Sequence, residues 1–338
     1  MYIDYFGLKD YPFRITPDTD YLFMSPVHSR AKAYMDYAIF NREGFVVITG
    51  EIGSGKTTLV KKLLSELDAN VIVAKLFQTQ LDEVELLQAI LVEFGLNPFS
   101  AKKVELLNML NQFLVNSYLD GKQIVLIIDD AQNLSKRVLE EITMLSSVET
   151  QKEKILHVIL VGQPELNHKL EAPDMEQLLQ RVSLRYHVRP LAKGEVKEYV
   201  EYRLKIAGLN KSVFVDEVYP ILYEYTGGVP RLINTLCDTA LTSAYADNVK
   251  YVDINEFQNA LNELQWKKYS DYHKSIKRSI NNDQLYGDEN DCGRRADSDN
   301  ASNFVGGICG PISSRALVEI SRQLKRIADH LDDKRDGN

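Results

Sequence analysis

The sequence predicts an α/β protein, in which a parallel sheet covered by helices precedes a smaller all-helical domain. Two patterns carry this prediction. Short runs rich in Val and Ile alternate with amphipathic stretches between residues 45 and 190, as in a parallel sheet with helices on both faces. Near Leu191 the pattern changes to helical periodicity alone. The chain has 338 residues, a length typical of two domains or of one large domain with appendages.

The strands are expected where apolar runs are short and nearly free of charge. They are Phe45–Thr49, Val71–Phe77, Ile124–Ile128 and Leu156–Val161. Between these runs, apolar residues recur at the spacing of one helix face. The helices are expected over Thr57–Leu67, Glu83–Phe94, Val104–Tyr118 and Val138–Leu145. Because strands and helices alternate, the strands should run parallel.

The second domain is expected to consist of helices only. Their ranges are Ala192–Ile206, Asp216–Tyr225, Pro230–Ala244 and Ile254–Leu264. Asp253 and Glu256 have the spacing of an N-terminal capping box for the last of them. We therefore place the first domain at residues 1–190 and the helical domain at residues 191–266.

The rest of the chain changes character twice. Residues 267–311 are rich in Asp, Asn, Ser and Gly, which predicts a flexible polar linker. Residues 312–333 recover helical periodicity, with five apolar side chains on one stripe: Leu317, Ile320, Leu324, Ile327 and Leu331. An amphipathic helix this short is not stable alone. It should dock either on the chain's own first domain or on a partner or neighbouring subunit.

Composition excludes several classes of protein. Lys and Arg total 40 and Asp and Glu total 48, for a net charge of −8, which argues against a general binder of polyanions. The three cysteines lie far apart with no CxxC pair, so neither a disulfide framework nor a zinc site is expected. No apolar run is long enough to span a membrane, and the first residues do not form a signal peptide. We expect a cytoplasmic protein that meets the inner membrane only through a partner.

The segment Gly50–Thr57 matches the pattern G-x-x-x-x-G-K-[ST]. An apolar strand leads into it and an amphipathic helix leads out, which is the context that a phosphate-binding loop requires. Lys56 is expected to neutralise the β- and γ-phosphates of ATP, and the Thr57 hydroxyl is expected to ligate Mg²⁺. The residues predicted to bind nucleotide are Gly50, Glu51, Ile52, Gly53, Ser54, Gly55, Lys56, Thr57 and Thr58.

A second motif follows the strand Ile124–Ile128. It ends in Asp129 and Asp130, as a Walker B element does. Asp129 is expected to hold Mg²⁺ together with Thr57. Asp130 is expected to orient or deprotonate the attacking water. The alternative is a pair of acids that merely ends a strand, and the preceding phosphate loop disfavours it.

Six blocks of sequence, in order, make a resemblance specific. They are MYIDYFGLKDYPFRITPD, GFVVITGEIGSGKTTL, IIDDAQNL, LVGQPEL, QRVSLRYHVRPL and TGGVPRLINTLCDTAL. On these blocks the chain resembles the AAA+ ATPases of the ExeA (general secretion pathway A) type, and among them the shorter members associated with exosortase and exopolysaccharide loci. The resemblance implies a P-loop AAA+ core with a five-stranded parallel sheet, followed by an all-helical lid. It also implies that nucleotide lies between core and lid and between subunits.

The resemblance implies further site residues. Gln163 resembles the sensor-1 polar residue at the end of the fourth strand, and Arg231 resembles the sensor-2 arginine of the lid. Arg181 and Arg185 lie where an arginine finger is expected. They are four residues apart, so on a helix they would share one face. The alternative for both is an ordinary surface arginine.

Two departures from the family matter. Asp130 stands where the family usually has Glu, and it is one methylene shorter. Slower hydrolysis, or a less directly held water, is implied. Longer secretion members carry a membrane span and a cell-wall-binding domain after the ATPase, and this sequence shows neither, so cell-wall binding is not carried over.

Three functions fit these observations. The first is an ATPase that binds and hydrolyses Mg·ATP, forms ATP-dependent homo-oligomers, and drives or regulates assembly of an envelope export system for secretion or exopolysaccharide. The second is a DNA-associated AAA+ regulator such as a transposition helper. It is not favoured, because Lys and Arg are scattered and form no basic helix or stripe. The third is a nucleotide-gated scaffold that binds ATP but barely hydrolyses it.

Overall fold

The computed structural model describes residues 2–40, 44–77, 79–98, 102–149 and 153–271. All of these residues belong to one compact unit. Most of the predicted linker 267–311 and the whole predicted helix 312–333 lie outside the described residues, so both remain predictions.

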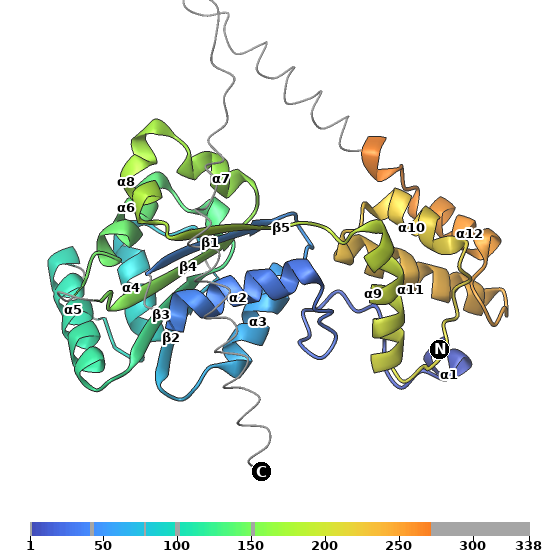
Figure 1. Cartoon of the computed structure of the whole chain (residues 1–338), viewed down its shortest axis with the longest axis horizontal. Coiled ribbons are helices and arrows are strands. Elements are labelled where there is room, and N and C mark those ends of the chain that lie inside the picture. The colour runs from blue at the N-terminus through green and yellow to red at the C-terminus, as the bar shows by residue number, and fades with distance from the viewer. Residues whose placement is uncertain (1, 41–43, 78, 99–101, 150–152, 272–338) are drawn as a thin grey trace, which may run out of the picture. The chain divides into compact units, whose positions relative to one another are not determined.

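The core is built on five parallel strands (Figure 1). They are β1 Phe45–Gly50, β2 Val71–Leu76, β3 Gln123–Ile128, β4 Leu156–Gly162 and β5 Leu184–Val188. Their order in the sheet is β2-β3-β4-β1-β5. The predicted fold class, an α/β core with a five-stranded parallel sheet followed by a helical domain, is therefore confirmed.

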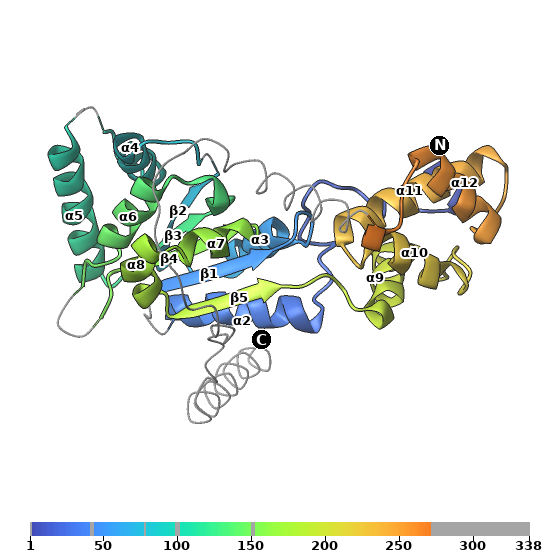
Figure 2. The ribbon, with the colours of Figure 1, turned by 90° about the horizontal axis from the view of Figure 1, so that it is seen from above.

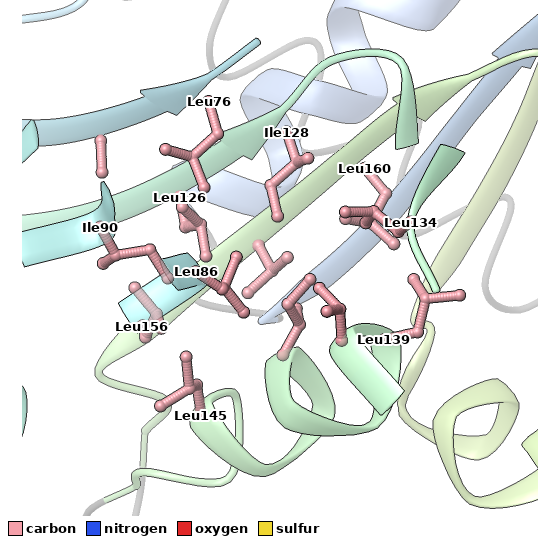
Figure 3. Close-up of a cluster of buried hydrophobic side chains, with 14 of the residues drawn as sticks. Leu76, Leu86, Ile90, Leu126, Ile128, Leu134, Leu139, Leu145, Leu156 and Leu160 are labelled. Atoms are coloured by element: carbon pink, nitrogen blue, oxygen red, sulfur yellow. The ribbon is translucent and has the colours of Figure 1, made fainter. Parts of the chain in front are cut away.

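Helices cover both faces of the sheet, because successive side chains of each strand point to opposite sides. Leu126 and Ile128 of β3 pack on one side in a buried cluster (Figure 3). The helices of this cluster are α4 Glu83–Glu93, α5 Lys103–Leu119, α6 Lys136–Leu145, α7 Glu165–Leu170 and α8 Glu176–Arg181. Short 3-10 turns at Ala131–Asn133 and Pro173–Met175 separate some of these elements.

The other face of the sheet belongs to two helices. Val125 and Ile127 of β3 pack there with side chains of α2 Pro26–Phe40 and α3 Lys56–Glu66. Figure 2 shows α2 running beside β5. Periodicity predicted α3 but neither α2 nor β5. Apart from its terminal Val188, the residues of β5 are at least partly exposed, because it is an edge strand.

Four helices form what we call the lid. They are α9 Lys193–Ile206, α10 Val218–Thr226, α11 Pro230–Ala246 and α12 Ile254–Leu264. They agree with the predicted helices within two residues at each end. The Asp253 side chain caps α12 by accepting from two main-chain N–H groups.

The N-terminal segment packs with the lid rather than with the sheet. Its helix α1, Tyr2–Phe6, buries Tyr2 and Phe6 in the same cluster as Leu204 of α9. The rings of Phe13 and Phe214 pack edge to face, with their centroids 6.1 Å apart. The predicted division, with residues 1–190 all in the first domain, therefore differs from the structure at its N-terminal end. Aromatic side chains far from the lid in sequence complete its core, which periodicity alone does not reveal.

Candidate functional site

The strand order gathers the sequence motifs at one edge of the sheet. β4 lies between β1 and β3, and all three run parallel, so the loops at their carboxyl ends are neighbours. The phosphate loop follows β1, the two aspartates follow β3, and Gln163 follows β4. A ligand at this edge would meet all three loops together.

Two glycines shape the phosphate loop. Gly53 and Gly55 have φ angles of 79° and 94°, which L side chains rarely adopt. Gly55 caps helix α3, which begins at Lys56. The loop thus places the N-terminus of α3, with its main-chain N–H groups, at the site. A helix N-terminus in this position favours binding of an anion.

Lys56 is held inside the loop. Its Nζ donates to the carbonyl of Gly50 at 2.7 Å and to the carbonyl of Glu51 at 2.9 Å. Burial lowers the pKa of Lys56 from its ordinary value, and the carboxylates of Asp129 and Asp130 oppose that shift. A buried cation at a helix N-terminus is suited to a polyanionic ligand.

Thr57 and Asp129 meet across the site. Burial raises the pKa of the Asp129 carboxyl, and hydrogen bonds from the Thr57 hydroxyl and from the Asp130 main chain lower it. A hydroxyl and a carboxylate are oxygen ligands of the kind that Mg²⁺ takes, with substrate phosphates and water completing its shell. The residues therefore fit Mg²⁺ bound with a nucleotide. In the described part of the chain no cluster of three His, Cys, Asp or Glu side chains could hold a metal by itself.

Asp130 has a left-handed backbone, with φ 53° and ψ 35°. Its carboxylate is exposed in the cavity described below, and its Oδ1 accepts from Nε2 of Gln132 at 3.2 Å. Oε1 of the same Gln132 side chain accepts from the main-chain N–H of Gln163 at 2.9 Å. Asp130 and Gln163 thus lie on either side of one glutamine.

The lid reaches the phosphate loop through Arg231. Its main-chain N–H donates to the carbonyl of Gly53 at 3.2 Å. A cavity of about 520 Å³ opens here between the loop, the lid and the N-terminal segment. The predicted site residues that line it are Ile52, Gly53, Gly55, Lys56, Thr57, Thr58, Asp130, Gln163 and Arg231.

One wall of the cavity was not predicted. The segment from Arg14 to Asp18 lines it together with Tyr199, Arg203 and Asn234 of the lid. This segment belongs to the block MYIDYFGLKDYPFRITPD, which is part of the family resemblance. No residue of that block was predicted to belong to the site.

Arg203 fixes this wall in place. It is only 7% exposed, and its guanidinium donates to the carbonyls of Pro12 and Arg14 and to the hydroxyl of Tyr199. Asn234 also donates to the carbonyl of Arg14, at 3.3 Å. The N-terminal segment is therefore anchored to α9 and α11 where it faces the cavity.

His28 of α2 buttresses the loop from the other side. Its Nε2 lies 2.8 Å from the carbonyl of Ser54 and donates to it, so Nδ1 accepts from the Ser25 hydroxyl at 2.7 Å. Burial lowers the pKa of His28, which favours this neutral form. Nothing in the sequence marked His28, because its contact with the phosphate loop is to a main-chain carbonyl.

The two candidate finger arginines lie apart from the cavity. Arg181 ends α8 and donates to the carbonyl of Thr143 at 3.2 Å. Arg185 lies in β5 and forms an ion pair with Glu171 at 3.2 Å. The expectation that they share a helix face is wrong, because the helix ends between them. Both side chains are exposed, and neither lines the described cavity.

Comparison with known proteins agrees with this geometry. Residues 40–170 match the family model described as an AAA domain, and these residues hold the phosphate loop, the aspartate pair and Gln163. These residues therefore form a domain similar to the AAA domain. Over 247 residues, or 73% of its length, it is 40% identical to General secretion pathway protein A of Aeromonas hydrophila. It spans 45% of the length of that relative.

Solved structures share the fold of this chain. Cdc6p from Pyrobaculum aerophilum matches with a TM-score of 0.55 and 16% identity, over 77% of this chain and 70% of that one. The ORC2 protein of Aeropyrum pernix, solved as ADPNP-ADP complexes, matches with a TM-score of 0.51 and 16% identity, over 70% of this chain and 66% of that one. At such identities the likeness concerns the fold. Within the residues that the structure describes, no helix is long and apolar enough to cross a bilayer.

Proposed function

We propose that this chain binds Mg·ATP in the cavity at the carboxyl edge of the sheet and hydrolyses it. One observation carries the proposal: Lys56, the Thr57–Asp129 pair and Asp130 converge at the N-terminus of α3. Phosphoryl transfer to water requires a cation for the phosphates, oxygen ligands for Mg²⁺ and a carboxylate that can accept a proton from the water.

Each of these groups has a separate task. Lys56 would release its bonds to the loop carbonyls in part and donate to the β- and γ-phosphates, since its ammonium has three N–H groups and two bind the loop. Thr57 and Asp129 would hold Mg²⁺, which neutralises phosphate charge when bound. Arg231, whose main chain contacts Gly53, would extend its guanidinium to the same phosphates.

Asp130 would orient the attacking water and accept its proton. Aspartate is one methylene shorter than the glutamate usual in the family. It would therefore hold the water less directly, and ATP hydrolysis would be slow. Gln163 supports it from the end of β4, as a polar group that lines the same cavity.

Assembly into ATP-dependent homo-oligomers is also proposed. Arg181 and Arg185 are exposed and lie outside the chain's own cavity. An arginine finger acts on the nucleotide of a neighbouring subunit, so exposure away from the home site is compatible with that role.

We propose that the nucleotide cycle drives or regulates assembly of an envelope export system, for secretion or for exopolysaccharide. Support comes from the identity to General secretion pathway protein A. Because the chain spans only 45% of that relative, the relative's whole activity is not transferred. The chain would work on the cytoplasmic side of the inner membrane through a partner. A DNA-associated role is not favoured, since the solved relatives support the fold alone.

The test is ATP turnover by the full-length protein with Mg²⁺, with the metal chelated, and with duplex DNA added. We expect Mg²⁺-dependent turnover that DNA does not stimulate. Proteins that co-purify with the tagged chain from its native host should include envelope components. Stimulation by DNA, together with a co-purified transposase, would overturn the export assignment.

A further inference from the structure

Gln132 joins the two loops on which hydrolysis is proposed to depend. It lies in the turn Ala131–Asn133 directly after the aspartate pair and is 8% exposed. Its Nε2 donates to Asp130 Oδ1 at 3.2 Å, and its Oε1 accepts from the Gln163 main-chain N–H at 2.9 Å. One amide therefore connects the loop after β3 with the loop after β4.

Only a neutral amide of this length makes both bonds. The Gln163 side of the bridge needs an acceptor and the Asp130 side needs a donor, and glutamine offers one of each. The structure also leaves space for it. At Gly162 a Cβ atom would come 3.0 Å from Oε1 of Gln132 and 2.9 Å from the Leu166 side chain. Glycine at this position therefore avoids a steric clash with the Gln132 amide.

The backbone around Gln132 is fixed independently. Nζ of Lys169 in α7 donates to the carbonyls of Gln132 and Leu134. The turn is thus tied to α7 by its main chain, while the Gln132 side chain remains available to hold Asp130.

We infer that Gln132 is a positioning residue that aims the Asp130 carboxylate at the attacking water and sets its place relative to Gln163. This inference rests on the proposed ATP hydrolysis. Asp130 is exposed and lines the cavity. Because Oδ1 is engaged by Gln132, Oδ2 is the oxygen left to accept the proton of the water. A misplacement of about 1 Å is enough to cost up to about 10²-fold in rate.

The test compares full-length wild type with Gln132→Glu and Gln132→Leu. Gln132→Glu has the same shape and keeps the acceptor for Gln163, but it sets a second carboxylate against Asp130. Gln132→Leu removes both bonds. Gln258→Glu is the matched control, because Gln258 is an exposed residue of α12 with a similar amide bond to a neighbouring oxygen, Asn262 Oδ1, at 3.3 Å.

We expect both Gln132 variants to lower kcat by about 10-fold or more. KM, and the Kd of a non-hydrolysable ATP analogue, should stay within about threefold of wild type, since a transition-state role moves kcat alone. Gln258→Glu should behave as wild type. Wild-type kcat in Gln132→Glu would overturn the inference, as would a parallel loss of analogue binding, which indicates a structural role. No turnover in wild type would refute the proposed function itself.

Discussion

The main-chain N–H of Arg231 donates to the carbonyl of Gly53 at 3.2 Å, so the first turn of a lid helix rests on the phosphate loop. The contact is tight. A Cβ atom at Gly53 would lie 2.4 Å from Cβ of Arg231. Glycine at this position allows the lid to contact the loop. A substitution that separates them should change the affinity for a ligand bound between them.

Gly53→Ala should therefore weaken nucleotide binding through the lid. Gly95→Ala is the matched control, because Gly95 has the same φ of 79° but nothing within 4 Å of its Cβ position. Both variants should lose about 1 to 2 kcal/mol of unfolding free energy from the left-handed backbone. Only Gly53→Ala should raise the Kd for Mg·ATP, measured by calorimetry. Equal nucleotide affinity in the two variants would refute the lid contact.

His28 should make stability depend on pH. Burial lowers its pKa below the ordinary value of 6.5, so below pH 6.5 the unfolded chain takes up a proton that the folded chain resists. The free energy of unfolding should therefore fall as pH decreases below 6.5. His28→Gln should flatten that part of the curve, as read from melting temperatures. His187, whose pKa is also lowered by burial, should supply part of the slope that remains.

The control for His28 is His168→Gln, because His168 is exposed on α7. This variant should keep the wild-type dependence on pH. A slope in His28→Gln as steep as that of wild type would show that the imidazole contributes nothing.

Asp129 and Asp130 should fail in different ways. Asp129→Ala removes the carboxylate paired with Thr57, so the Mg²⁺ dependence of nucleotide binding should be lost. Asp130→Asn should bind ATP but turn it over on the order of 10²-fold more slowly, because the water loses its acceptor. Asp130→Glu should match or exceed wild-type turnover. Equal and mild effects of Asp129→Ala and Asp130→Ala would argue against two separate tasks.

Arg181 and Arg185 are tested by mixing subunits. If either acts in trans, its alanine variant should lose on the order of 10³-fold in turnover while still binding ATP. Mixing that variant with Lys56→Ala should restore activity, since one subunit supplies the arginine and the other the intact site. Arg137→Ala, an exposed arginine of α6, is the control. Turnover that does not rise with protein concentration, or in mixtures, would exclude a finger.

The sequence predicted what local patterns determine and missed what distant contacts determine. Strands of Val and Ile and the Gly50–Thr57 loop were predicted because each is encoded in consecutive residues. β5 was missed because, as an edge strand, it keeps polar residues such as Arg185 and His187. Gln132 and His28 were missed because their partners include main-chain groups far along the chain.

The N-terminal wall of the cavity was missed for a related reason. Arg203 holds the segment near Arg14 by donating to main-chain carbonyls. Every residue has such a carbonyl, so no pattern of side chains in the sequence predicts these bonds. Arg181 and Arg185 share the spacing of a helix face, but Val182 and Ser183 lead into β5 and break the helix. Spacing predicts a shared face only where the helix continues.

The most direct measurement is Mg·ATP binding and turnover by Lys56→Ala, beside wild type and Lys62→Ala. Lys62 lies on the same helix, and its 37% exposed side chain pairs with Glu66 instead of with the loop. We predict that Lys56→Ala remains folded and loses on the order of 10²-fold or more in turnover, while Lys62→Ala matches wild type. A folded Lys56→Ala protein that hydrolyses ATP like the wild type would contradict the assignment of the site.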